Sequence, residues 1–321
     1  MNFFKFFNKD ILTKLLLAAI LTASFSISGC NKKTAETKDT MVSSKIKIKI
    51  TKDQMERPNL REDFEKAKKQ NSDTVAWISI PGTDINYPVV QDLQNRSTST
   101  CSEDYYAHRD FLGNRVAIGK ESAIMSHKAN AISPFEKLSN NVVISGHNVN
   151  LDDNPNGKMF APLNNFKDIE FSKKTPYIFL TTEDKDLVYE VFASYNSEER
   201  FGYFLPKESK KEMAEMIKEA KKRSNFIYDD VKVSDKDKVL TLYTCTYSFG
   251  RWKSLGYYRV KYVVQARLLS DEEKLRAVDS IRENPSPTPV YYSYCARCNK
   301  EMTVEKCSAN YGLCDSCKNK K

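Results

Sequence analysis

Val239-Leu240-Thr241-Leu242-Tyr243-Thr244-Cys245 is an apolar run that ends in a cysteine. Its β-branched and aromatic residues predict a strand, and a strand that ends there would deliver Cys245 to the rim of a sheet or barrel. A second run, Val142-Val143-Ile144-Ser145-Gly146, leads in the same way to His147. A thiol nucleophile needs a base or an imidazolium partner, because free cysteine is mostly protonated near neutral pH. Two such strands are what a Cys–His site at a barrel rim requires, but the spacing alone is a weak signal, because a buried structural cysteine is the commoner case.

The rest of the central sequence is rich in short strand-like runs. They lie at residues 75–80, 85–90, 141–145, 175–180, 187–195, 239–244 and 257–269. Helical periodicity is predicted for residues 61–70 and 206–223, and a capping-box pattern from Ser270 to Glu273 predicts a third helix to about Glu283. The methionine-bearing face of the second helix is typical of core packing rather than of a cofactor site. Many short strands with an inserted helix favour a β-barrel that carries helices.

The composition is ordinary for a folded domain, with 40% hydrophobic and 29% charged residues in a chain of 321. The formal net charge of +9 comes from 51 basic against 42 acidic residues, and the lysines are spread along the whole sequence. Surface solubility explains this charge better than a dedicated binding face does, so we do not expect nucleic acid as a partner.

The first 29 residues are predicted to be a lipoprotein signal peptide. Lysines flank an apolar run from Leu15 to Ile27, which is shorter than the roughly 20 residues that span a bilayer. The run leads to Ile27-Ser28-Gly29-Cys30, which resembles a bacterial lipobox in which Cys30 is lipidated. A plain secretory signal or an uncleaved anchor is the alternative. Residues 30–60 are polar and are interpreted as a tether between a lipid-anchored, extracytoplasmic surface and the folded domain.

Several motifs in order give the sequence a specific family resemblance. Thr241-Leu242-Tyr243-Thr244-Cys245 resembles the TLxTC signature of sortases, and Gly146-His147 their Gly-His motif. The segment from Trp77 to Gln91 is similar to the opening of class B sortases in particular, as are residues 105–108 and 157–163. The resemblance covers residues 61–270. It implies a closed eight-stranded sortase barrel with an N-terminal helix and a helix before the penultimate strand.

The resemblance also implies a cysteine transpeptidase that needs no cofactor for catalysis. Cys245 would attack a threonine carbonyl in the C-terminal sorting signal of a surface protein. A peptidoglycan-precursor or pilin amine would then resolve the thioacyl enzyme. His147 would protonate the leaving amine and deprotonate the incoming one. Thr244 and Tyr243 would contact the substrate. The setting would be the outer face of the cell membrane, toward the cell wall.

The arginine expected in such a site is irregular in this sequence. An ungapped match to the Val263-Val264 pair puts Lys261 at the arginine position, whereas Arg259 is two residues earlier and would project from the same face of a strand. A guanidinium offers forked donors that an ammonium copies poorly. We therefore expect Arg259 to be the third catalytic residue, with Lys261 or Arg251 as alternatives.

The C-terminal residues form a separate, cysteine-rich segment. Residues 271–289 are expected to be a helix followed by a Pro-rich linker, and residues 290–321 a small module. Two Cys-x2-Cys pairs, Cys295/Cys298 and Cys314/Cys317, are fifteen residues apart. This spacing is typical of a structural zinc ribbon, which a segment too short for its own core would need. Disulfides are the alternative in an extracytoplasmic protein.

Two other functions are compatible with parts of the sequence. The chain could be a non-catalytic surface lipoprotein that uses a sortase-like barrel and the zinc ribbon to bind partners. It could also be another cell-wall Cys–His enzyme, although the Ser-His-Gly-Cys pattern of L,D-transpeptidases is absent. The retained Cys245 and His147 favour an active sortase over both.

Overall fold

The computed structural model describes residues 57–96, 103–117, 120–149, 152–198, 201–203, 206, 209–249, 260–298, 300–303, 306 and 309–319. The predicted signal peptide, Cys30 and nearly all of the tether therefore lie outside the described residues. None of the described helices is long and apolar enough to span a bilayer.

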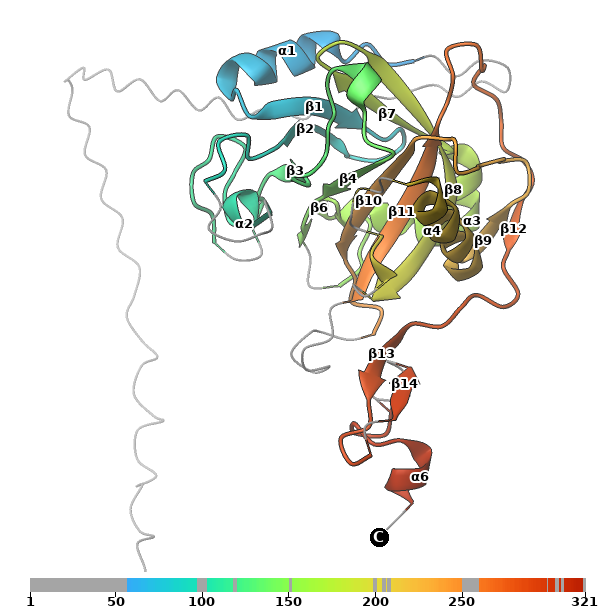
Figure 1. Cartoon of the computed structure of the whole chain (residues 1–321). Coiled ribbons are helices and arrows are strands. Elements are labelled where there is room, and N and C mark those ends of the chain that lie inside the picture. Colours follow the sequence, from blue (N-terminus) through green and yellow to red (C-terminus); the bar gives the residue numbers. More distant parts are fainter. Residues whose placement is uncertain are drawn as a thin grey trace, which may run out of the picture. The chain divides into compact units, whose positions relative to one another are not determined.

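Eight strands close into a barrel (Figure 1). In chain order they are β1 (Thr74–Ser79), β2 (Asn86–Val90), β3 (Ile124–Ser126), β4 (Asn141–Ser145), β7 (Tyr177–Thr182), β8 (Asp186–Glu198), β10 (Val239–Cys245) and β11 (Val260–Leu268). Around the barrel the order is β1-β2-β3-β4-β10-β11-β8-β7, and pairing of β7 with β1 closes it. The β2–β3 and β4–β10 pairs are parallel and the others antiparallel. The prediction of a closed eight-stranded barrel with few helices is confirmed.

Strands β4 and β10 read as continuous apolar runs because they lie side by side inside the fold. Every residue of β4 is buried, and in β10 only Cys245 is partly exposed. Parallel strands that are covered on both faces lose the usual polar alternation, which explains the two sequence runs. The pairing extends from Val239 with Asn141 to Tyr243 with Ser145. Both strands therefore run in the same direction and end at the same rim.

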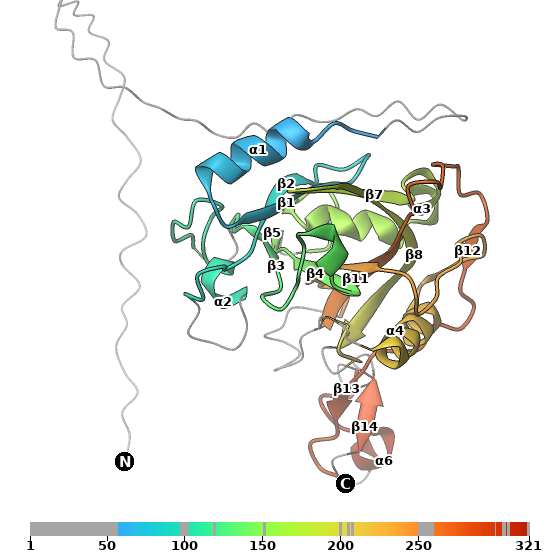
Figure 2. The same cartoon turned by 45° about the horizontal axis from the view of Figure 1, so that its top comes forward.

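Helices cover the outside of the barrel, together with short two-stranded pairs. The helices are α1 (Arg61–Gln70), α2 (Glu103–Tyr106), α3 (Ile169–Lys174) and α4 (Lys210–Arg223), with 3-10 helices η1 (Phe135–Lys137) and η2 (Ala161–Lys167). The short strands are β5 (Asn148–Val149), β6 (Lys158–Met159), β9 (Phe226–Tyr228) and β12 (Ile281–Glu283). Helix α1 lies along β1 in both Figure 1 and Figure 2, with Phe64 and Ala67 packed against Trp77.

Helix α4 begins later than the sequence pattern indicated, at Lys210 rather than near Pro206. Ser209 and Glu212 form a complete capping box, which fixes the helix start. The buried face of the helix carries Met213 and Met216, as the core interpretation requires.

The helix expected after Ser270 is absent, so that prediction is wrong. Residues 271–280 form a turn and irregular structure that leads into β12. Ser270 N does donate to Glu273 Oε2 at 2.8 Å, so the capping contact forms without a helix. The Tyr177 hydroxyl donates to Arg276 O and accepts from Arg276 N. Val278 is fully buried. These contacts hold the segment against the barrel and take up backbone groups that a helix would need.

The cysteine-rich segment contains its own small elements. Strands β13 (Tyr291–Tyr294) and β14 (Glu301–Thr303) pair in antiparallel fashion, and α6 (Asp315–Lys318) follows. Met302 packs against Cys295, Cys314 and Cys317 in a buried cluster. Cysteines, rather than a conventional set of apolar side chains, therefore make up most of this cluster.

Candidate active site

The parallel pairing of β4 and β10 brings Cys245 and His147 to one rim of the barrel. Tyr243 pairs with Ser145, and the two reactive residues each follow by two positions. The register continues past the end of β4, because Gly146 N donates to Tyr243 O at 3.3 Å. Both Cys245 and His147 are half-buried, which shields them partly from water and leaves them accessible. Their predicted proximity is thus a direct consequence of strand order.

Gly146 is required for the chain to pass between two core side chains just before His147. A Cβ at this position would lie 2.5 Å from Ile124 Cδ1 and 2.8 Å from Phe160 Cγ. Real Cβ atoms do not approach other atoms this closely, so a larger residue would force the side chains of Ile124 and Phe160, or the backbone that carries the imidazole, to shift.

The imidazole of His147 is oriented by a backbone carbonyl. Nε2 lies 2.8 Å from Ala107 O, and the carbonyl can only accept, so Nε2 carries a proton. In the neutral ring, Nδ1 is then the nitrogen that takes up and releases a proton. The His108 ring stacks nearby, with its centroid 6.4 Å from that of His147. Sequence reasoning missed the role of Ala107, since a backbone acceptor leaves no residue-type signal.

Lys261 lies beside the cysteine. It pairs with Cys245 across β10 and β11, and its Nζ donates to Cys245 Sγ at 3.2 Å. Arg259, the arginine favoured from the sequence, and Arg251 both lie outside the described residues. The assignment of Arg259 therefore stays a prediction, while Lys261 is the described cation in contact with the thiol.

Thr244 and Tyr243 join β10 to the segment that carries His147. Thr244 Oγ1 donates to Gly146 O at 2.7 Å, and Tyr243 O accepts from Gly146 N. The Tyr243 ring packs edge-on against Tyr203 at 5.6 Å between centroids. Both side chains are buried, and their contact with substrate stays a prediction.

A carboxylate that the sequence did not single out fastens the loop after the nucleophile. Asp153 accepts hydrogen bonds from Lys167 Nζ at 2.7 Å, Tyr247 N at 2.7 Å, Thr246 Oγ1 at 2.8 Å and Ser248 Oγ at 2.9 Å. Asn148, next to His147, donates to the same carboxylate at 3.2 Å. Asp153 therefore links the residues that follow both catalytic candidates.

The charge balance in this network favours an ionised Asp153. Burial would raise the pKa of Asp153, but hydrogen bonds from Lys167 and from the Tyr247 backbone outweigh burial and lower it. The pKa of Lys167 is lowered as well, because burial of its ammonium outweighs the attraction of Asp153. The lowered pKa values favour the ionised form of Asp153 and disfavour the ionised form of Lys167. We regard the carboxylate as the firmly held charge, because it has several donors besides the lysine.

The four predicted metal ligands converge in the C-terminal segment. The Sγ atoms of Cys295, Cys298, Cys314 and Cys317 all lie within 4.8 Å of one another, and each cysteine is a free thiol. The Cys298 and Cys314 sulfurs are 3.5 Å apart. A tetrahedral zinc with four thiolates requires sulfur–sulfur separations of about 3.8 Å, so this donor set fits a metal ion.

The pKa of each thiol shifted in this cluster depends on its neighbours. Hydrogen bonds, first from the Cys314 backbone, lower the pKa of Cys295 to about 6. Interaction with the neighbouring sulfurs, first that of Cys298, raises the pKa of Cys317 to about 12. Such mutual dependence is expected where several thiols converge on one point.

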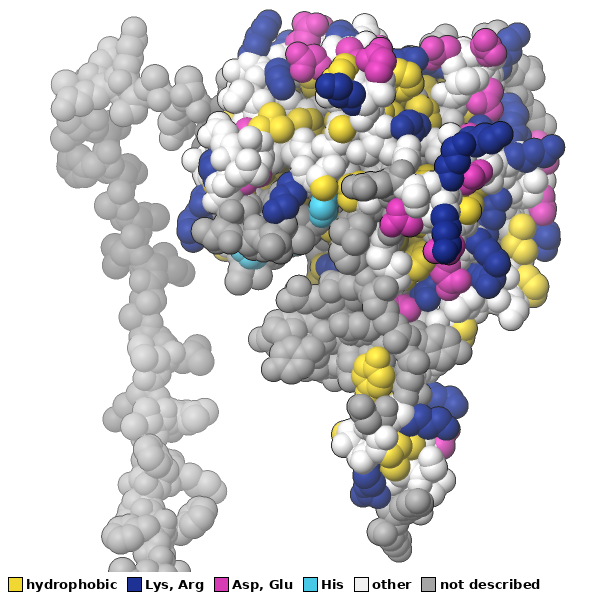
Figure 3. Space-filling model, viewed as in Figure 1, with side chains coloured by type: hydrophobic (Ala, Val, Ile, Leu, Met, Phe, Trp, Pro, Cys, Tyr) yellow, Lys and Arg dark blue, Asp and Glu magenta, His cyan; other side chains and the backbone are white. Residues whose placement is uncertain are grey.

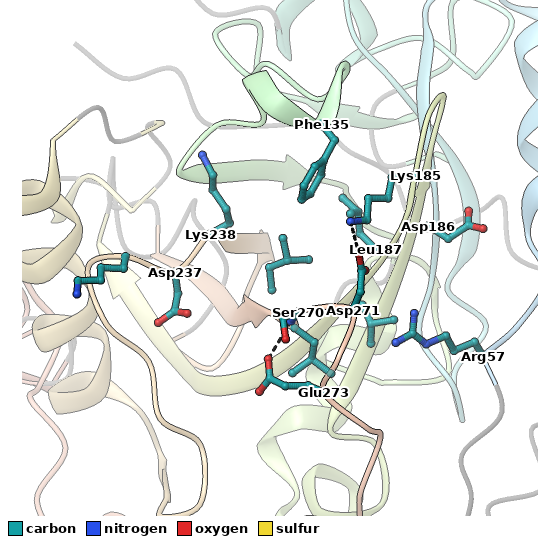
Figure 4. Close-up of a pocket in the computed structure, with 14 residues that line it drawn as sticks. Arg57, Phe135, Lys185, Asp186, Leu187, Asp237, Lys238, Ser270, Asp271 and Glu273 are labelled. Atoms are coloured by element: carbon teal, nitrogen blue, oxygen red, sulfur yellow. Dashed lines mark hydrogen bonds and ion pairs between the residues drawn. The ribbon is translucent and has the colours of Figure 1, made fainter.

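A hollow of about 370 Å³ lies away from the candidate site (Figure 4). Its lining includes Lys238, just before β10, and Asp186, at the start of β8. Since β10 ends at Cys245, this hollow is at the opposite end of the barrel. Its Lys185 pairs with Asp271 at 2.7 Å and lies over the Phe135 ring. The hollow has a mixed polar and apolar lining whose described residues include no cysteine or histidine.

Surface charge gives no sign of a dedicated polyanion site on the face drawn in Figure 3. Basic and acidic side chains are interspersed over the described part of the barrel.

Comparisons with known proteins agree with this geometry. The sequence model of the Sortase domain matches residues 78–269. Sortase B of Listeria monocytogenes is 27% identical over 213 residues, which cover 66% of this chain and 76% of that protein. A Staphylococcus aureus sortase B–substrate complex has a TM-score of 0.52 at 25% identity, and the match covers 66% of this chain and 87% of that chain. A sortase B structure complexed with triglycine has a TM-score of 0.53 at 25% identity and covers 67% of this chain and 88% of that chain.

Proposed function

The chain belongs to the sortase family of cysteine transpeptidases, and on that premise we propose that it cleaves C-terminal sorting signals at a threonine carbonyl and transfers the protein to an amine. The observation that carries the proposal is the parallel pairing of β4 and β10, which sets Cys245 and His147 at one rim. The similar sortase B structures complexed with a substrate and with triglycine support a peptide donor and an amine acceptor.

In the first half of the reaction, His147 Nδ1 takes the proton of the Cys245 thiol, and the resulting thiolate attacks the threonine carbonyl carbon. The carbonyl electron pair moves to oxygen and forms a tetrahedral oxyanion. When the oxyanion collapses, the C–N bond breaks and His147 gives a proton from Nδ1 to the leaving amine. The C-terminal peptide departs, and the substrate remains as a thioester on Cys245.

In the second half, an amine of a cell-wall precursor or a pilin attacks the thioester. His147 Nδ1 takes the proton that the attacking amine loses, and collapse of the second oxyanion expels the Cys245 thiolate. The new amide joins the surface protein to its acceptor. His147 then returns its proton to the thiolate, so the enzyme regains its starting protonation state and the cycle needs no cofactor.

The assay uses the full-length chain in detergent with fluorogenic sorting-signal peptides and a triglycine acceptor. We expect cleavage after threonine, a thioester adduct on Cys245 by mass spectrometry, and loss of cleavage in Cys245→Ala and His147→Ala. Cys101→Ala is the matched thiol control, because Cys101 belongs to no sortase motif. A folded, reduced protein that forms no adduct and cleaves no peptide would instead favour a partner-binding lipoprotein.

We also propose that the C-terminal segment is a zinc ribbon. The thiolates of Cys295, Cys298, Cys314 and Cys317 would hold the ion, which would crosslink a segment with little core of its own. Disulfide pairing fits less well, because four sulfurs that converge on one point suit a single four-coordinate ion. The zinc would stabilise the segment and take no part in acyl transfer.

We further propose that Cys30 is lipidated and anchors the enzyme to the outer face of the membrane. The support is the lipobox-like Ile27-Ser28-Gly29-Cys30 sequence after a short apolar run. A dually acylated terminus gives stable anchoring, whereas a single chain binds only marginally. Mass spectrometry of the wild-type chain should show a lipid on Cys30, and Cys30→Ala should lack it. A wild-type chain with an unmodified Cys30 would contradict lipidation.

A further inference from the structure

Lys261 holds a positive charge against the nucleophile. Its Nζ lies 3.2 Å from Cys245 Sγ, within the range for a hydrogen bond to sulfur. Both residues are half-buried at the rim, so the interaction is less screened than one on an open surface.

The barrel, rather than a loop, fixes this contact. Strands β10 and β11 pair continuously from Val239 with Arg267 to Cys245 with Lys261. Residues directly opposite each other in antiparallel strands project their side chains from the same face. On its other side, β11 pairs with β8, where Lys261 is opposite Ser197. Lys261 is thus held between two strands, and its position is set by register.

We propose that Lys261 is a catalytic residue that supplies the cationic charge to the acyl-transfer site. The inference rests on the proposed function, because it assigns a role within the same reaction. In the resting enzyme the ammonium pairs with the sulfur of Cys245. During transfer the carbonyl carbon is bonded to that sulfur, and the ammonium donates to the oxyanion that forms on this carbon. An ammonium has three donors and so can serve sulfur and oxygen at once.

This assignment differs from the sequence-based expectation of Arg259. An arginine was favoured for its planar fork, which matches an oxyanion better than a point charge does. The strand register provides a separate criterion, because it aligns Lys261 with the nucleophile. Arg259 precedes the described part of β11, so it is included in the test as the competing residue.

The test measures the charge at the thiol without requiring substrate cleavage. Cys245 in the full-length protein is alkylated at pH 8.5 with anionic iodoacetate and with neutral iodoacetamide, and adducts on Cys245 are quantified by peptide mass spectrometry. A nearby cation accelerates the anionic reagent selectively. We expect the iodoacetate-to-iodoacetamide rate ratio to fall about fivefold in Lys261→Met and to be retained in Lys261→Arg. Lys218→Met, on the exposed side of α4, is the matched control for loss of one positive charge.

Two outcomes would overturn the proposal. One is an unchanged rate ratio in Lys261→Met, and the other is a ratio that falls in Arg259→Gln while Lys261→Met resembles the wild type. Lys261→Gln provides a second, polar replacement if the methionine variant does not fold. With cleavable peptide, Lys261→Met should lower kcat more than Lys261→Arg does. If no peptide is cleaved by the wild type but the rate ratio still depends on Lys261, the proposed function fails while the charged contact stands.

Discussion

Asn148 Nδ2 donates to the carbonyl oxygen of Cys245 at 3.0 Å. Asn148 directly follows His147 in the chain, so this bond ties the backbone beside the imidazole to the backbone of the nucleophile. The same amide group also donates to Asp153. The separation of Cys245 and His147 is therefore set both by strand register and by a side-chain crosslink. Such a crosslink should affect catalysis more than substrate binding, because reacting groups tolerate little displacement.

Replacing Asn148 with alanine removes this crosslink without touching either reactive side chain. We expect kcat for sorting-peptide cleavage to fall about tenfold or more, with a smaller change in KM. Steady-state kinetics of Asn148→Ala with the peptide substrate measures this. Asn154→Ala, at an exposed position between β5 and β6, is the control. A rise in KM with unchanged kcat would show instead that Asn148 acts in substrate binding.

Asp153 should make stability depend on pH in the acid range. Its pKa is lowered in the folded protein, so its contribution is complete above the unfolded value of about 3.9 and is lost as pH falls through the folded value. Asp153→Asn should reduce the free energy of unfolding by about 1–3 kcal/mol at pH 7. The difference in free energy of unfolding between wild type and Asp153→Asn should stay constant from pH 7 to pH 5 and decrease below pH 4.

Urea denaturation at pH 7, 5 and 3.5 tests this dependence. Asp279→Asn, an exposed aspartate after the barrel, provides the control. A gap between wild type and Asp153→Asn that is equally large at pH 3.5 would mean that Asp153 acts through shape or packing rather than through its charge.

The features that could be predicted from sequence are those that depend on the local pattern of apolar and polar residues. The apolar runs before Cys245 and His147 predicted β10 and β4, and the amphipathic pattern with Met213 and Met216 predicted α4. The pattern after Ser270 predicted a helix that does not form. The capping contact with Glu273 is present, but contacts with the barrel hold the following residues in an irregular conformation.

The parts of the site that could not be predicted depend on contacts between distant segments. Asp153 is more than ninety positions from Thr246, Tyr247 and Ser248, and nothing in its own neighbourhood indicates that it will bind them. The choice between Lys261 and Arg259 likewise depends on register. Because alternate residues of a strand share a face, sequence alone allows both, and pairing with Cys245 is visible only in the folded barrel.

The cysteine cluster should bind about one zinc ion per chain. In Cys317→Ser the bound zinc should fall well below one equivalent, because a thiolate ligand is replaced by a weak one. Metal content measured by mass spectrometry on the reduced full-length protein tests this. Peptide cleavage by Cys317→Ser should match the wild type, because the cluster is expected to act only in the C-terminal segment. An unchanged zinc content would contradict the four-thiolate site, and loss of cleavage would link the segment to catalysis.

Gly146→Ala should damage the site through sterics alone. The added methyl would lie 2.5 Å from Ile124 Cδ1 and 2.8 Å from Phe160 Cγ. These side chains, or the backbone next to His147, must move to relieve the overlap. Overpacking of this kind typically costs about 1–3 kcal/mol. We expect a lower free energy of unfolding and a lower kcat, measured by urea denaturation and peptide cleavage. Ile124→Val removes the Cδ1 methyl, so the double variant should regain part of both losses. If Ile124→Val restores neither, the ring of Phe160 or the backbone itself is the obstacle, and the displacement of His147 cannot be attributed to the contact with Ile124.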